Sequence, residues 1–157
     1  MTPSFEVFII VDKPPALAYE AVADPARLSA YFTTAGAKGR AETGATVTWE
    51  FADFPGPFPV EIIEATPNES IAFRWDSNEK TNNEKQEGTA LKTEVHFHFE
   101  PLDNGMRTKV TVSEGGWTDT PDGLKASYGN CMGWSQMLCA MKAWLEYGIN
   151  LRKGAYV

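Results

Sequence analysis

Residues 91–113 read LKTEVHFHFEPLDNGMRTKVTVS, and apolar or small side chains alternate with charged or polar ones on both sides of a short turn. Because successive side chains of a strand point to opposite faces of a sheet, residues 91–100 and 106–113 are predicted to be two strands. Asp103, Asn104 and Gly105 between them are typical turn residues, so the two strands are expected to form an antiparallel hairpin. A sheet with one apolar face needs another element to cover that face.

The chain on the N-terminal side of this hairpin contains further predicted strands. Residues 5–11 (FEVFIIV) are rich in β-branched and aromatic side chains, and residues 46–51, 60–65 and 71–76 are further short apolar runs. Two short helices are predicted between the first two of these strands, with Asp24 as the N-cap of the second helix and a proline at its first position. The first strand is expected to pair with a late strand and close the sheet.

Only the C-terminal segment is long enough to cover the apolar face of this sheet. Thr120 is a predicted helix N-cap, and apolar residues recur at steps of three and four from Trp134 to Ile149. Gly129 and Gly133 each weaken a helix by up to about 1 kcal/mol relative to alanine, so the helix is expected to begin weakly, to bend there, or to use a glycine to approach the sheet closely.

These segments together predict one α+β domain over residues 1–157. A curved antiparallel sheet wraps around a long C-terminal helix, and two short helices follow the first strand. The segment of residues 76–89, which is rich in Asn, Glu and Lys, is predicted to be a solvated loop between two strands.

The order of these segments resembles the START-like (SRPBCC) superfamily, and within it the branch similar to the activator of Hsp90 ATPase (AHSA1-like proteins). The resemblance covers nearly the whole chain and rests on PPALAYEAVADPARLSAYF (14–32), FPVEIIEATPNESIAFRWD (58–76), TEVHFHFEPLDNGMRTKVTVSEGGW (93–117) and Gly133-Trp134. It implies a helix-grip fold with an apolar cavity between sheet and helix. It does not imply one activity, because the superfamily includes lipid and hormone carriers, polyketide cyclases and aromatases, and co-chaperones.

The predicted ligand-binding residues are the large apolar side chains that face inward from the strands and the helix, together with two inward threonines. They are Trp49, Phe51, Phe73, Trp75, Thr93, Phe97, Phe99, Thr108, Trp134, Met137 and Met141. Apolar walls with a few polar groups suit a hydrophobic small molecule. The alternative is a filled core, in which the same side chains pack against one another.

Motifs for other chemistry are absent from the sequence. His96 and His98 share a strand face with Glu94 and Glu100, a spacing that can hold a metal, but this is the outward polar face, so they are predicted to be solvated strand residues. The chain has no GxxxxGK[ST] or GxGxxG loop, no GxSxG motif and no CxxC pair. No catalytic residue, cofactor or metal is therefore predicted.

Binding of a hydrophobic small molecule in the cavity, without catalysis, is the predicted function, and two alternatives stay open. A polyketide cyclase/aromatase-like enzyme would need polar groups inside the cavity to act as acid and base. A co-chaperone-like interaction module would need an exposed docking patch for a protein partner, for which the stiff aromatic loop of residues 54–58 is the one hint.

Charge and composition bear on location and partners. The net charge is −7 and the longest basic cluster is Arg152-Lys153, which argues against nucleic acid and anionic lipid as partners. No apolar run approaches the roughly 20 residues of a membrane span, and the N-terminus lacks signal-peptide features. If Cys131 and Cys139 share one helix, they are expected to lie about 12 Å apart along its axis, too far for a disulfide. A cytoplasmic protein is expected, and the sequence gives no signal for an oligomeric state.

Overall fold

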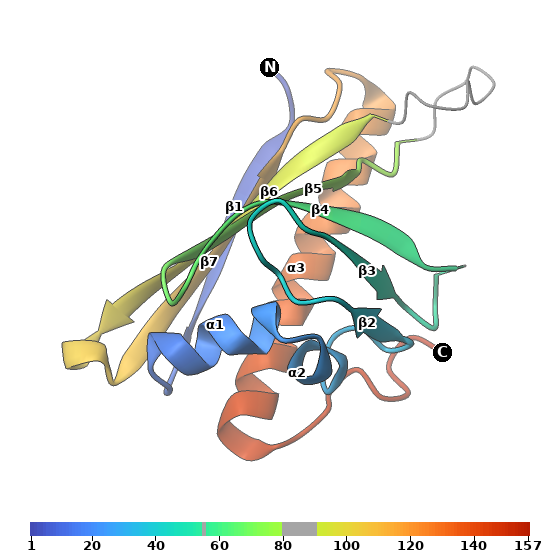
Figure 1. The fold of residues 1–157 in the computed structure, drawn as a ribbon. Helices are drawn as coiled ribbons and strands as arrows, with labels where there is room; N and C mark the ends of the chain where they lie inside the picture. The colour runs from blue at the N-terminus through green and yellow to red at the C-terminus, as the bar shows by residue number, and fades with distance from the viewer. Residues whose placement is uncertain (55, 80–90) are drawn as a thin grey trace.

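The computed structural model describes residues 1–54, 56–79 and 91–157, so the predicted loop of residues 76–89 falls largely outside the described residues. The strands are β1 (Ser4–Val11), β2 (Gly36–Lys38), β3 (Thr46–Glu50), β4 (Phe58–Thr66), β5 (Ser70–Asp76), β6 (Lys92–Leu102) and β7 (Arg107–Gly115). The helices are α1 (Pro15–Ala23), α2 (Pro25–Ser29), α3 (Pro121–Tyr147) and the short 3-10 helix η1 (Asp103–Gly105) (Figure 1).

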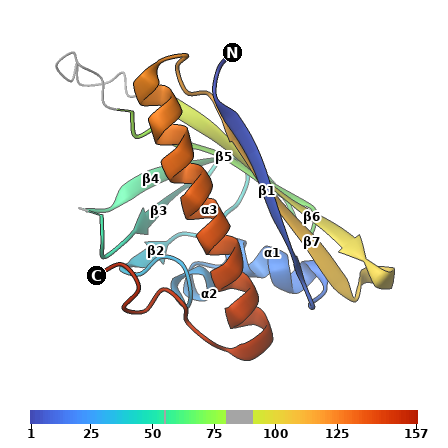
Figure 2. The same ribbon diagram turned by 180° about the vertical axis from the view of Figure 1, so that it is seen from behind.

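All seven strands form one antiparallel sheet in the order β1-β7-β6-β5-β4-β3-β2. The predicted pairing of the first strand with a late strand is confirmed, because β1 lies beside β7 with Val7 opposite Val112. Helix α3 crosses one face of the sheet, and α1 and α2 lie at one end of the sheet (Figure 2). The predicted α+β helix-grip fold is therefore confirmed.

The hairpin that defined the fold has slightly different boundaries from the predicted ones. Asp103 and Asn104 both have positive φ angles, 51° and 57°, and the turn extends through Met106, which is 72% exposed and lies outside β7. The three-residue strand β2 was not predicted, because so short a segment cannot show an alternating pattern.

The predicted helix starts are confirmed by their capping bonds. The Asp24 carboxylate accepts a hydrogen bond from the backbone N–H of Ala26 at 2.9 Å, and the Thr120 hydroxyl accepts one from the N–H of Gly123 at 3.1 Å. Helix α3 runs without a break past both of its central glycines. It ends at Tyr147, earlier than the apolar pattern predicted, because Gly148 follows with a φ of +68°.

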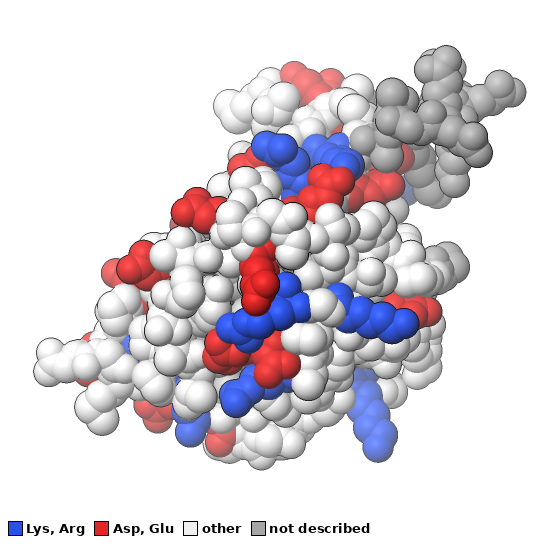
Figure 3. Space-filling view, in the orientation of Figure 1, with Lys and Arg blue, Asp and Glu red and all other residues white. Residues whose placement is uncertain are grey.

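The space between the sheet and α3 is filled by apolar side chains. Phe73, Phe97 and Phe99 from the strands meet Met137 and Met141 from the helix, and all five are buried. On the outer face of the sheet, acidic and basic side chains lie side by side, for example Arg74 and Glu94 at 3.2 Å (Figure 3). None of the helices in the described ranges is long and apolar enough to cross a membrane.

Candidate functional site

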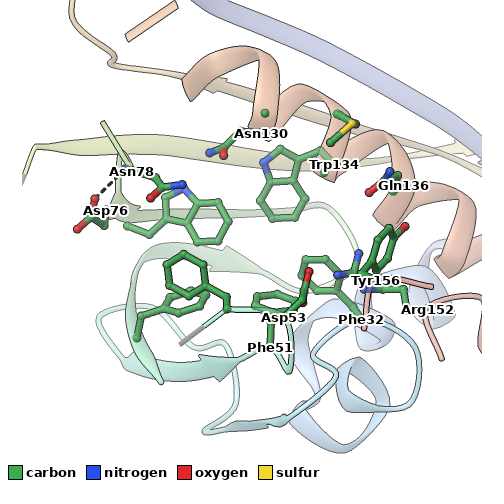
Figure 4. Close-up of a pocket in the computed structure, with 16 residues that line it drawn as sticks. Phe32, Phe51, Asp53, Asp76, Asn78, Asn130, Trp134, Gln136, Arg152 and Tyr156 are labelled. Atoms are coloured by element: carbon green, nitrogen blue, oxygen red, sulfur yellow. Dashed lines mark hydrogen bonds between the residues drawn. The ribbon is translucent and has the colours of Figure 1, made fainter. Parts of the chain in front are cut away.

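An open pocket of about 530 Å³ lies at one end of the sheet, where α3 passes over the ends of β3, β4 and β5 (Figure 4). Its walls come from the segment after α2, the β3–β4 connection, the end of β5, the middle of α3 and the chain beyond α3. The lining residues are Phe32, Phe51, Asp53, Phe54, Phe58, Trp75, Asp76, Asn78, Gly129, Asn130, Met132, Gly133, Trp134, Gln136, Arg152 and Tyr156.

Aromatic rings form most of the inner wall of the pocket. The rings of Trp75 and Trp134 lie 5.3 Å apart between centroids, and Phe32 lies 5.7 Å from Trp134 and 4.9 Å from Phe51. Phe58 continues the wall, 5.8 Å from both Phe51 and Trp75. Such contacts fix ring orientations, so the wall is a set of flat apolar surfaces held in place by one another.

A buried carboxyl group supports this wall from behind. Glu114 on β7 is 2% exposed, and its Oε1 accepts hydrogen bonds from Trp75 Nε1 at 2.8 Å, Thr93 Oγ1 at 2.6 Å and Asn130 Nδ2 at 2.9 Å. Its Oε2 accepts one from Trp134 Nε1 at 2.7 Å. Because an indole N–H can only donate, the buried Trp134 and the half-buried Trp75 each need an acceptor where water cannot reach the N–H group. Glu114 therefore fixes both indoles and Asn130 relative to the sheet.

Glu114 was missed by the sequence reasoning although a signal for it exists. The alternation that places Thr108, Val110 and Val112 inward also places Glu114 inward, two residues later on the same strand. A charged residue at an inward position is the exception that marks a buried polar network, because an unpaired buried charge is costly.

Arg152 is a second pocket residue that the sequence reasoning missed, and it comes from the chain beyond α3. After Gly148, the chain turns back toward β2 and β3 (Figures 1 and 2), and the Asn150 side chain accepts hydrogen bonds from the backbone N–H groups of Arg152 and Lys153. This turn places the Arg152 guanidinium over Phe32, Phe51 and Tyr156, with 5.3, 5.5 and 4.6 Å between its central carbon and the ring centroids.

Acidic and amide groups lie around the rim of the pocket. Asp76 and Asn78 are exposed and bonded to each other, since the Asp76 carboxylate accepts from the Asn78 backbone N–H at 2.7 Å. They lie at the end of the pocket opposite Arg152, and Asp53 lies on the exposed loop that follows β3 (Figure 4). Gln136 adds an amide from α3.

The eleven predicted ligand-binding residues divide into two groups in the structure. Phe51, Trp75 and Trp134 line the pocket together. The other eight lie in the buried interior and do not line it, namely Trp49, Phe73, Thr93, Phe97, Phe99, Thr108, Met137 and Met141. The two threonine hydroxyls are bonded inside the protein, Thr93 to Glu114 and Thr108 to the Lys13 carbonyl at 2.8 Å. Ligand contact by any of the eleven stays a prediction.

The two histidines project from the outer face of the sheet, as the alternation predicted. His96 Nε2 lies 2.7 Å from Glu94 Oε1, and this contact lowers the pKa of the Glu94 carboxyl below its usual value. Within the described part of the chain, no group of three or more His, Cys, Asp or Glu side chains is placed to hold a metal ion. Of the predicted aromatic loop of residues 54–58, Phe54 and Phe58 line the pocket.

Comparison with known proteins gives a family match over most of the chain. The family described as "Activator of Hsp90 ATPase homolog 1-like protein" matches residues 12–146. A search of curated proteins finds no match.

Solved structures share the fold over nearly the whole chain. Protein SSP2350 from Staphylococcus saprophyticus is 25% identical, with a TM-score of 0.74 and 96% of each chain covered. The Aha1 dimer from Colwellia psychrerythraea is 21% identical, with a TM-score of 0.69, over 93% of this chain and 98% of that one. CalU16 from Micromonospora echinospora is 16% identical, with a TM-score of 0.66, over 98% of this chain and 80% of that one.

Proposed function

Because the chain belongs to the family of activator of Hsp90 ATPase homolog 1-like proteins, which does not by itself define a ligand, we start from the geometry of the pocket and propose that the protein binds a hydrophobic small molecule there, at the end of the sheet beside α3. The observation that carries the proposal is the wall of Phe32, Phe51, Phe58, Trp75 and Trp134 facing an open space of about 530 Å³. Small-molecule sites of this kind are concave, mostly apolar and about 300–1,000 Å³ in volume.

The fixed orientation of the two tryptophans supports binding of a flat ligand. Glu114 holds both indole N–H groups, so the rings do not need to be ordered when a ligand enters. A wall that is already ordered avoids part of the entropy cost of binding. Glu114 itself accepts four hydrogen bonds and is not among the lining residues, so its role in this proposal is to position the wall.

The test is ligand-induced stabilisation of the purified protein. Native mass spectrometry would first look for a retained small molecule, and thermal melts against fatty acids, sterols and polyaromatic compounds would then identify the class. A ligand at about one hundred times its Kd stabilises the native state by about 2.7 kcal/mol, which for a chain of this size raises the melting temperature by about 5–10 °C.

A pair of matched variants locates the binding site. Phe54→Ala removes a half-exposed ring at the edge of the pocket, and Phe8→Ala removes a similarly exposed ring on β1, outside the pocket lining. We expect Phe54→Ala to weaken binding about fivefold, as loss of roughly 1 kcal/mol of apolar contact implies, and Phe8→Ala to leave it unchanged. Absence of any retained mass and any stabilisation in the wild-type protein would contradict the proposal.

A further inference from the structure

We propose, on the basis of the proposed function, that the ligand carries a single anionic group, such as a carboxylate or sulfonate, and that this group pairs with Arg152. The inference rests on a buried cation without a counter-charge. Arg152 is 8% exposed, and its Nε is buried and has no hydrogen-bond partner among the described residues. Among the residues that the structure describes, no acidic group forms an ion pair with Arg152 within 4 Å.

Burial without a partner is unfavourable for a guanidinium group. A charge removed from water costs free energy unless it is paired and hydrogen-bonded. The rings of Phe32, Phe51 and Tyr156 offer their faces to the cation, which offsets part of this cost. Ring faces do not satisfy the N–H donors in the guanidinium plane, and these donors match the two oxygens of a carboxylate or sulfonate.

The surroundings of Arg152 give the ligand an orientation. Arg152 is the only cationic residue among the described residues that line the pocket, and it lies beside Phe32 and Tyr156 (Figure 4). Asp76 and Asn78 lie at the opposite end, beyond Trp134. An anion is therefore favoured at the Arg152 end, and the apolar body of the ligand extends over Trp134 toward Trp75. Asp53, an exposed carboxylate on the same rim, opposes the anion through water and weakens binding moderately.

Two fluorescent compounds that share one aromatic body test the charge requirement. 1-Anilinonaphthalene-8-sulfonate carries a sulfonate, whereas N-phenyl-1-naphthylamine has the same ring system and no charge. Both are titrated into the wild-type protein and into Arg152→Met, with Lys153→Met as the matched control. Lys153 is the next residue and is exposed, so its substitution removes the same formal charge outside the pocket lining.

We expect Arg152→Met to weaken binding of the sulfonate about ten- to a hundredfold, the usual value of hydrogen bonds to a charged group, and to leave binding of the neutral compound within about twofold. Lys153→Met should leave both affinities unchanged. Arg152→Lys keeps the charge but loses the planar pair of donors, so it should weaken sulfonate binding by an intermediate factor. It also provides the comparison if the methionine variant does not fold.

The possible outcomes separate this inference from the function on which it rests. If the wild-type protein binds both compounds and Arg152→Met weakens both equally, or neither, the requirement for an anion is wrong and the apolar pocket stands. If the wild-type protein binds neither naphthalene compound but is stabilised by a neutral fatty alcohol, sterol or polyaromatic compound, the requirement for an anion is wrong. If no compound of the wider panel stabilises it either and no small molecule is retained, the proposed function itself is contradicted. Asp53→Asn gives an independent check, because removing the opposing carboxylate should strengthen binding of the sulfonate and not of the neutral compound.

Discussion

At the scale of single residues, Glu114 determines how rigid the pocket wall is. Its two oxygens serve Trp75, Thr93, Asn130 and Trp134, which come from β5, β6 and α3. One carboxyl group therefore connects three elements behind the pocket. Because the donors are buried or half-buried, they have no equally good partner in water if Glu114 is removed.

Glu114→Gln should lower the free energy of unfolding by about 1–3 kcal/mol, the cost of leaving a buried polar group unsatisfied. The amide oxygen can replace Oε1 and accept its three hydrogen bonds. The amide nitrogen then takes the place of Oε2 and faces the Trp134 N–H, so two donors face each other and neither is satisfied. Glu114→Leu leaves all four donors without an acceptor and should cost about 3–5 kcal/mol. Urea unfolding followed by tryptophan fluorescence measures both values.

The control for this prediction is Glu100→Gln, the same substitution on the exposed outer face of β6, for which a change within about 0.5 kcal/mol is expected. Equal stability of Glu114→Gln and the wild-type protein would show that Glu114 does not hold the indole groups. A change in near-ultraviolet circular dichroism of Glu114→Gln alone would show that the tryptophans have lost their fixed orientation.

At the scale of elements, α3 serves both as the cover of the sheet and as one wall of the pocket. Gly129 and Gly133 are one helical turn apart and both line the pocket. A methyl group at either position would meet no other atom within 4 Å, so neither glycine is needed for a close approach to the sheet. The helix is continuous through both glycines.

Gly133→Ala should therefore raise stability and lower ligand affinity at the same time. Alanine stabilises the interior of a helix by about 0.5–1 kcal/mol relative to glycine. The added methyl group projects into the pocket and should weaken binding of N-phenyl-1-naphthylamine about fivefold or more, because the ring can no longer lie against the helix backbone. Thermal melts and fluorescence titrations of the same variant measure the two effects.

Gly148→Ala is the comparison for the stability effect, since Gly148 ends the helix with a φ of +68°. Alanine in this left-handed conformation should destabilise the protein by about 1 kcal/mol, the opposite sign to Gly133→Ala. A loss of stability in Gly133→Ala would mean that the space beside this residue is occupied in solution.

At the scale of the whole molecule, local patterns were sufficient to predict the fold but only part of the site. Alternation predicted the inward positions of Phe73, Phe97 and Phe99, and capping residues predicted the helix starts, because each signal lies within a few neighbouring residues. The pocket depends on contacts between distant segments. Inward orientation did not distinguish Trp75, which lines the pocket, from Phe73, which is fully buried and does not line it.

The same limit explains Arg152. In the sequence, Arg152 and Lys153 form one basic pair at the end of the chain, but in the structure one is buried at the pocket and the other is exposed. The difference arises from the turn at Gly148 and Asn150, which brings the segment back over Phe32 and Phe51. No periodic pattern reports such a return of the chain.

The segment of residues 150–157 should therefore be needed for ligand binding in the pocket, and it should contribute little to the stability of the fold. Apart from Arg152, its side chains are exposed, so removing it should cost about 1–2 kcal/mol, mainly through exposure of Phe32 and Phe51. A chain ending at Ile149 should melt cooperatively, with the far-ultraviolet circular dichroism of the full chain. It should bind both naphthalene compounds at least tenfold more weakly, because Tyr156 and the stem of Arg152 form one side of the pocket.

Truncation and Arg152→Met thus have different expected effects on the neutral compound. The substitution removes a charge and keeps an apolar side chain of similar length, so N-phenyl-1-naphthylamine should still bind. The truncation removes the wall itself, so the neutral compound should be lost together with the sulfonate. Deletion of the exposed Val157 alone is the control and should change neither affinity.

If the truncated chain bound the neutral compound as tightly as the full chain, the site would consist of sheet and helix alone. The C-terminal segment would then act only on the charged end of the ligand.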